Sequence, residues 1–243
     1  MFERAHHRRI GRVLEAMDGV KLRALGCLFG GDTAIALRYG EYRESVDMDF
    51  LVADPEGYRR LRSWLSGATG IDALLRDGAS PVGLAREVRV DQYGIRTSLL
   101  VEGVAVKFEI VREARIALVA PGRRDKVCGV STLSELDLAA SKLLANADRW
   151  RDDSVFSRDA IDLAMMDLPP RKLHPALDKA AQAYGDAAVE DMRRALDSLR
   201  SRPERLQRCM AALSMTLPQA VLQQRLRMLR QRLDRWNGRA PPA

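Results

Sequence analysis

Residues 29–51 read FGGDTAIALRYGEYRESVDMDFL, and this stretch decides the fold class. The apolar run that leads into it, residues 25–29, predicts a buried strand, and residues 33–39 have the composition of a helix. The pair Gly30-Gly31 therefore lies at a strand-to-helix turn. Residues 45–52 predict a second strand, which completes a strand–turn–helix–strand unit.

The second strand carries polar side chains at alternate positions. Because alternate side chains share one face of a strand, Ser45, Asp47 and Asp49 are expected to point the same way, with the two carboxylates about 7 Å apart. Two carboxylates in a partly buried site repel each other unless a cation lies between them. Oxygen ligands with room for phosphate oxygens are typical of Mg²⁺, with Mn²⁺ as the alternative. Asp47 and Asp49 are therefore predicted metal ligands.

A third acid is expected on a neighbouring strand if two metals bind. In residues 104–111, VAVKFEIV, the even positions are apolar, so Glu109 faces away from the core, as Asp47 and Asp49 do on their strand. Glu109 is predicted to bind metal or to accept a proton from an attacking hydroxyl. The Gly30-Gly31 turn is predicted to present backbone N–H groups to a phosphate, with a hydroxyl contact from Thr33.

The rest of the chain divides into two kinds of pattern. Residues 86–111 predict a meander of strands, whereas the pattern beyond residue 131 is helical. This predicts an α+β fold. An α/β domain over residues 1–125, with a mixed or antiparallel sheet flanked by helices, is followed by a helical domain over residues 126–243.

Composition excludes several classes of protein. Hydrophobic residues make up 47% of the 243 and charged residues 30%, which is typical of a globular protein, and no apolar run is long enough to cross a membrane. Three widely spaced cysteines favour a reducing, cytoplasmic location. The net charge is +7, and residues 193–239 contain twelve arginines and three acids. This end either binds a polyanion such as RNA or is simply a solvated arginine face.

The sequence resembles the AbiEii/AbiGii toxin nucleotidyltransferases, within the polymerase-β-like nucleotidyltransferase superfamily. The resemblance rests on residues 29–51, on VKFEIV at 106–111 and on ASKLLANADRWRDDSVFSRDAIDLAM at 140–165. It implies the following roles. Asp47, Asp49 and Glu109 are metal-binding and catalytic, Lys142 and Asp159 are catalytic, and the nucleotide is bound by Gly30, Gly31, Thr33, Ser45, Lys142, Arg158 and Asp162.

The residues alone leave open whether Lys142, Asp159 and Asp162 are functional or structural. Asp159 and Asp162 are three positions apart and share a helix face, which also suits a structural ion-pair network, and Lys142 can be an ordinary lysine of an amphipathic helix. Asp32 stands in the turn where the family has a small residue. The histidines at positions 6, 7 and 174 show no ligand spacing and are expected to have no special role.

The resemblance implies a magnesium-dependent enzyme of a bacterial toxin–antitoxin or abortive-infection system. Such an enzyme transfers a nucleotide from a nucleoside triphosphate to an acceptor hydroxyl, for example an RNA 3′ end such as that of tRNA, and releases pyrophosphate. An antitoxin protein is an expected partner. Two alternatives remain: transfer to a small molecule or protein, and a binding module that has lost its chemistry.

Overall fold

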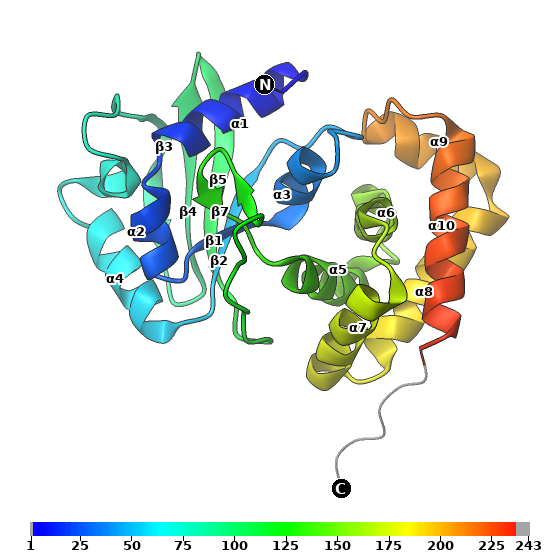
Figure 1. The fold of residues 1–243 in the computed structure, drawn as a ribbon. Coiled ribbons are helices and arrows are strands. Elements are labelled where there is room, and N and C mark those ends of the chain that lie inside the picture. Colours follow the sequence, from blue (N-terminus) through cyan, green and yellow to red (C-terminus); the bar gives the residue numbers. More distant parts are fainter. Residues whose placement is uncertain (1, 237–243) are drawn as a thin grey trace, which may run out of the picture. The chain divides into compact units, whose positions relative to one another are not determined.

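The computed structural model describes residues 2–236, which form two compact units that divide between residues 134 and 135. The first unit contains the sheet and the second is built of helices (Figure 1). No described helix is long and apolar enough to cross a membrane. Residues 126–134 belong to the first unit, because Thr132 pairs with Phe29 and the Leu133 N–H donates to the Phe29 carbonyl at 2.9 Å. The functional boundary expected at 125/126 stays a prediction.

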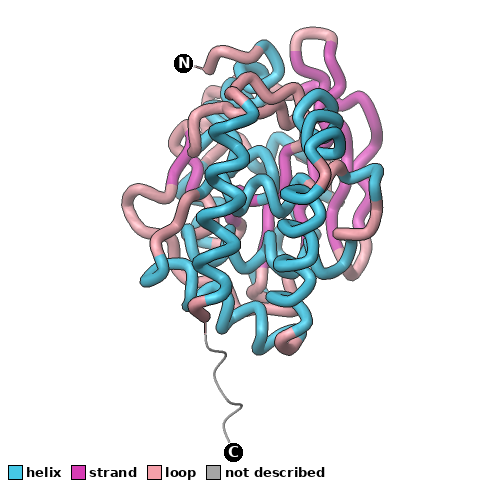
Figure 2. Tube along the Cα trace, turned by 90° about the vertical axis from the view of Figure 1, so that its right-hand side faces the viewer, coloured by secondary structure: helices cyan, strands magenta, loops and turns pink. Residues whose placement is uncertain are grey.

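The first unit consists of a five-stranded mixed sheet with helices packed against it. In Figure 2 its strands are magenta and its helices cyan. Its helices are α1 (Ala5–Ala16), α2 (Gly19–Ala24), α3 (Gly31–Arg38), α4 (Pro55–Leu65) and a 3-10 helix (Gly70–Leu74). The strands of the sheet are β1 (Leu28–Gly30), β2 (Met48–Val52), β3 (Gly83–Val90), β4 (Gly94–Val101) and β5 (Val104–Arg112), and a small hairpin follows with β6 (Lys126–Val127) and β7 (Val130–Ser131).

The order of strands in the sheet is β1-β2-β5-β4-β3. Only the β2–β5 pair is parallel, and the other neighbours are antiparallel. One face is apolar and carries a row of aromatic rings: the Phe29 and Phe50 centroids lie 5.3 Å apart, and those of Phe50 and Phe108 lie 5.5 Å apart. All three side chains are almost completely buried. The alternation in β5 therefore places Lys107 and Glu109 on the opposite face, as predicted. The expected α+β class with a mixed sheet is confirmed.

Two predicted strand boundaries are wrong. The first strand begins at Leu28 and includes Gly30, and the second begins at Met48 rather than Ser45. The chain reverses at Gly40 and Glu41, whose φ angles are +87° and +52°. Residues 42–47 then form an irregular segment, because several of its backbone groups bond to side chains rather than to a neighbouring strand.

The second unit is a bundle of helices around α5. Its helices are α5 (Glu135–Arg149), a 3-10 helix (Asp153–Val155), α6 (Arg158–Met166), α7 (Pro170–Tyr184), α8 (Ala187–Ser201), α9 (Pro203–Ala212) and α10 (Gln219–Asp234). Helix α5 packs against α6, α7 and α8, which explains why its leucines and alanines are buried. The helical character predicted beyond residue 131 is therefore correct.

Candidate active site

A row of in-register residues crosses the polar face of the sheet. Gly30 on β1 pairs with Asp49 on β2, Asp49 pairs with Glu109 on β5, and Glu109 pairs with Arg96 on β4. Paired residues on neighbouring strands have their side chains on the same face, about 5 Å apart. The sheet thus brings together two acids that are sixty positions apart in the sequence.

Gly31 lies against the Asp49 carboxylate. Its φ angle is +66°, and a Cβ atom on it would lie 2.5 Å from Asp49 Oδ2 and 2.9 Å from Asp49 Cβ. Glycine is therefore required at this turn both by the backbone conformation and by the space available. The close approach places the first turn of α3 directly beside the acid.

Asp47 lies just before β2, and its backbone is fixed by two buried hydroxyls. Thr33 Oγ1 donates to the Asp47 carbonyl at 2.5 Å, and Ser45 Oγ lies 2.7 Å from Thr33 Oγ1. Since Thr33 has one hydroxyl proton, Ser45 is the donor in the second bond. The hydroxyls of Thr33 and Ser45 are thus engaged within the protein, at a site next to the predicted metal ligands.

A cleft of about 860 Å³ opens on this face of the first unit. Asp47 and Glu109 both line it, together with Lys107. The cleft continues over β4 and β3, where Arg86, Arg89 and Arg96 line it. Two of the three predicted acids therefore face the same open space, and the third, Asp49, pairs with Glu109 at its side.

The environment of Asp49 disfavours its ionised form. Burial, and after it the neighbouring charges of Asp32, Asp47 and Glu109, together raise the pKa of this carboxyl from 3.8 to about 7, against the opposing effect of Lys107. A carboxylate in such a place is stabilised by a bound cation. The donor set, carboxylate oxygens beside open space, fits Mg²⁺ or Mn²⁺.

Two other acids of the cluster, Glu109 and Asp32, have cationic partners. Glu109 contacts Lys107 Nζ at 2.7 Å and Arg96 Nε at 3.2 Å. Asp32, in the first turn of α3, pairs with the buried Arg43 at 3.1 Å. The unexpected acid in the glycine turn is therefore compensated by a cation of the same unit.

The other predicted residues lie in the second unit. Lys142 on α5 is 3% exposed, and its ammonium lies 3.0 Å from Asp159 and 2.7 Å from Asp162, both on α6. Arg149 forms two further hydrogen bonds to Asp159, at 2.8 and 2.9 Å. Arg158 is the first residue of α6. The shared helix face predicted for Asp159 and Asp162 is correct, and within this unit the two acids form a buried ion-pair network.

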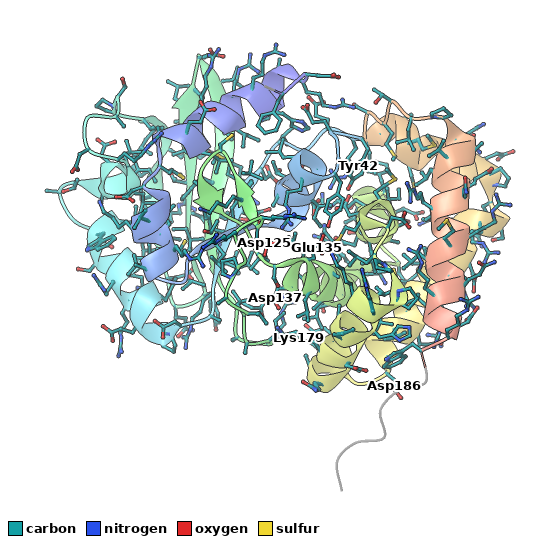
Figure 3. The ribbon with its side chains drawn as sticks, in the orientation of Figure 1. Tyr42, Asp125, Glu135, Asp137, Lys179 and Asp186 are labelled. Atoms are coloured by element: carbon teal, nitrogen blue, oxygen red, sulfur yellow. The ribbon has the colours of Figure 1, made fainter. Side chains whose placement is uncertain are left out.

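A second buried ion pair in this unit also connects α5 to a neighbouring helix. Asp137 on α5, which is fully buried, pairs with Lys179 on α7, and Figure 3 labels both residues. Burying a carboxylate is tolerated only when it is paired. The charged residues of α5 thus fix the positions of two neighbouring helices.

Replacing Lys142 with methionine is expected to destabilise the protein by about 3–5 kcal/mol, because two buried carboxylates lose their shared cation. Lys172→Met is the matched control. Lys172 pairs with Glu135, but its side chain is 48% exposed, so the loss should be about 0–1 kcal/mol. Urea unfolding followed by circular dichroism measures both. Equal and small losses would contradict a structural role for Lys142.

Several residues of the cleft were not predicted from the sequence. Arg96 contacts Glu109, and Arg86 and Arg89 line the same space. The hairpin turn at residues 102–103 fixes the β4–β5 register, so the pairing of Arg96 with Glu109 was available from the sequence. His6 also lines the cleft, and no signal of spacing or neighbouring residues pointed to it.

The chain belongs to a family of nucleotidyltransferases. The family model for the nucleotidyl transferase AbiEii toxin of type IV toxin–antitoxin systems matches residues 12–237. This chain is thus a member of the AbiEii family of toxin nucleotidyltransferases, as its resemblance implied. A comparison with curated proteins finds no match.

Two solved structures from Helicobacter pylori are similar to this chain. One is described as a nucleotidyltransferase, with 15% identity, a TM-score of 0.49 and coverage of 96% of this chain and 97% of the other. The second is JHP933, with 15% identity, a TM-score of 0.49 and coverage of 94% and 92%. This likeness is too remote to transfer the role of any residue.

Proposed function

We propose that this protein is a magnesium-dependent transferase that moves a nucleotide from a nucleoside triphosphate to an acceptor hydroxyl, with release of pyrophosphate. This is chemistry of the EC 2.7.7 type. The observation that carries the proposal is the in-register pair Asp49 and Glu109 beside the Gly31 turn, with Asp47 lining the same cleft as Glu109. Asp47, Asp49 and Glu109 would hold the metal, Mg²⁺ or Mn²⁺.

The residues of the first unit suit each part of this reaction. The Gly30-Gly31 turn presents the N-terminus of α3 to a phosphate, where backbone N–H groups favour an anion. A bound Mg²⁺ would draw electron density from the α-phosphate and make the acceptor hydroxyl easier to deprotonate. The hydroxyl oxygen bonds to the α-phosphorus as the bond to the β-phosphate oxygen breaks. Glu109, which lines the cleft, accepts the hydroxyl proton.

The residues of the second unit have a different place in the proposal. The family resemblance implies that Lys142, Arg158 and Asp162 bind the nucleotide and that Asp159 is catalytic. The charge of Lys142 is already balanced by Asp159 and Asp162, so little net charge is left there to attract a phosphate. We therefore assign the chemistry to the carboxylates of the first unit and a supporting role to this network.

The assay uses purified protein, Mg²⁺, each labelled nucleoside triphosphate in turn, and total tRNA. Asp47→Asn and Glu109→Gln are each expected to reduce transfer by at least 100-fold, because both remove a negative charge from the metal site while keeping the shape of the side chain. Asp54→Asn is the matched control, since Asp54 caps α4 and contacts Gly57 rather than the cleft. Transfer at the wild-type rate in Asp47→Asn and Glu109→Gln contradicts the proposal. Nucleotide binding without turnover in the wild type supports an inactive binding module instead.

We propose RNA as the acceptor, and we place its contact on the first unit. The arginines of the C-terminal helices are largely neutralised by acids of the same unit: Arg193, Arg194, Arg200, Arg205, Arg225, Arg230 and Arg232 all have ion-pair partners. Arg239 lies outside the described residues. This pattern favours the solvated arginine face for that end of the chain.

Arg86 and Arg89 differ from those arginines. Both are exposed, both line the cleft, and among the described residues neither has an ion pair with an acid. Arg89 also pairs directly with Arg96 across β3 and β4. Like charges in this position repel each other, and since Arg96 already pairs with Asp91 and Glu109, an anion beside Arg89 would reduce the repulsion that remains. A phosphodiester strand lying over β3 and β4 would bring its terminal hydroxyl toward Glu109.

Arg86→Gln with Arg89→Gln is expected to weaken RNA binding about 10-fold and to reduce the slope of log affinity against log salt by roughly one to two. The KM for the nucleoside triphosphate should stay unchanged. Arg200→Gln with Arg230→Gln, which removes paired arginines of the second unit, is the control. A loss of RNA affinity only in the control variant would instead place the RNA contact on the second unit.

The family also implies an antitoxin as a partner of this toxin.

A further inference from the structure

Asp47 is held differently from the other two acids. Asp49 and Glu109 lie within paired strands, so the hydrogen bonds of the sheet fix their backbone. Asp47 lies in the irregular segment 42–47 before β2 begins. Its position in the cleft therefore depends on the bonds that this segment makes to the rest of the unit.

His7 of α1 makes the first of these bonds. Its ring is completely buried. Nε2 lies 3.1 Å from the Ser45 backbone nitrogen, and Nδ1 lies 2.7 Å from Glu41 Oε1. A backbone N–H only donates, so Nε2 is the acceptor and the proton is on Nδ1, which donates to Glu41. His7 thus connects Glu41, just before the segment, to Ser45 within it.

His6, the preceding residue, contacts the next position of the same segment. Its Nε2 lies 3.0 Å from the Val46 carbonyl and donates to it. The bonds from α1 to Ser45 and Val46 are followed by the bond from Thr33 to the Asp47 carbonyl. Three consecutive residues are therefore held by side chains from α1 and α3.

Glu41 anchors this arrangement. Its carboxylate accepts from the Glu3 backbone nitrogen at 2.8 Å and from the Arg4 backbone nitrogen at 3.3 Å, at the beginning of α1. A carboxylate is favourable at the N-terminus of a helix. In addition, Arg4 Nε donates to the Glu41 carbonyl at 3.1 Å. The start of α1 and the segment before β2 are consequently fixed to each other.

We propose that His6 and His7 are positioning residues that hold Asp47 at the metal site through the backbone of Ser45 and Val46. The proposal rests on the proposed function in one respect, the assignment of Asp47 as a metal ligand. Neither histidine needs to bind the metal. Partners outside the ligand shell orient ligands in this way, and losing one weakens metal binding about 10–100-fold.

The test is Mn²⁺ binding by full-length protein, followed by electron paramagnetic resonance, together with the Mg²⁺ concentration that gives half-maximal transfer. His7→Leu fills the buried site with an apolar side chain and removes both hydrogen bonds of the imidazole. It is expected to weaken Mn²⁺ binding about 10-fold and to raise the required Mg²⁺ by a similar factor. Leu14→Ala is the control, because it removes buried apolar contacts of the same helix and no side-chain hydrogen bond to the segment.

A second variant covers the case in which His7→Leu does not fold. His6→Ala changes a half-buried side chain and removes only the bond to Val46, so it should fold and bind Mn²⁺ several-fold more weakly than wild type. Wild-type Mn²⁺ affinity in a folded His7→Leu or in His6→Ala, with reduced affinity in Asp47→Asn, overturns the positioning role and leaves the proposed function intact. An equal loss of Mn²⁺ affinity in His7→Leu and Leu14→Ala also overturns the positioning role. Wild-type affinity in Asp47→Asn overturns the proposed metal site itself.

Discussion

Asp49→Asn is expected to abolish nucleotide transfer and, in the absence of metal, to make the protein more stable. Folding raises the pKa of Asp49 from 3.8 to about 7. Between pH 3.8 and about 7, the folded state therefore binds a proton at this carboxyl that the unfolded chain has already lost. Stability therefore falls as the pH rises through this range. Asparagine cannot ionise, and at pH 8 the gain should approach about 4 kcal/mol as an upper value.

The gain should depend on pH and on metal. It should shrink as the pH is lowered from about 7 toward 4, because the carboxyl of the wild type then binds a proton in the fold. Mg²⁺ should raise the melting temperature of the wild type at pH 8 and leave that of Asp49→Asn almost unchanged. Scanning calorimetry across this pH range, with and without Mg²⁺, measures both effects. Lower stability of Asp49→Asn at pH 8 without metal would contradict this account of the site.

Gly31→Ala is expected to reduce kcat by about 100-fold or more, since the added Cβ would displace the Asp49 carboxylate and a misplacement of about 1 Å has an effect of this size. The Cβ would lie 2.5 Å from Asp49 Oδ2. The backbone effect is separable, because Gly26 has nearly the same φ angle, +63° against +66° for Gly31, and nothing lies within 4 Å of its missing Cβ.

Gly26→Ala is therefore the matched control for backbone strain. It should destabilise the protein by about 1 kcal/mol and leave transfer at the wild-type rate. Steady-state kinetics and urea unfolding of the two variants separate strain from displacement. Equal kcat in Gly31→Ala and Gly26→Ala would show that the contact between Gly31 and Asp49 has no part in catalysis.

Local patterns in the sequence predicted the parts of the site that local interactions determine. The alternation of residues 104–111 predicted the face of Glu109, and the meander predicted over residues 86–111 contains the β4–β5 hairpin, with its two-residue connection at 102–103. Both residues of that turn have positive φ angles, as a tight hairpin turn requires. The register of this hairpin then places Arg96 beside Glu109.

The parallel pairing of β2 with β5 had no local signal. Asp49 and Glu109 meet because the whole unit folds around the aromatic row of Phe29, Phe50 and Phe108, and no turn connects the two strands directly. From the sequence, the two acids were related only by the expectation of a third acid on a neighbouring strand and by the family resemblance. Their closeness is a property of the tertiary fold.

The prediction of a strand over residues 45–52 was wrong for residues 45–47, for a related reason. Its alternating pattern is genuine, but the backbone of Ser45 and of Asp47 bonds to the side chains of His7 and Thr33. Those partners are distant in the sequence or belong to another element, so a period of two cannot reveal them. The same holds for Lys142, whose buried partners lie on a different helix.

The central claim is that Asp47, Asp49 and Glu109 hold a divalent cation on the polar face of the sheet. Anomalous scattering from a crystal grown with Mn²⁺ and a non-hydrolysable nucleoside triphosphate tests it most directly. The account predicts a peak about 2.1 Å from carboxylate oxygens of Asp47 and Asp49, with Glu109 at or beside it, and triphosphate oxygens completing the coordination. Density for the nucleotide with no peak at these carboxylates would contradict it.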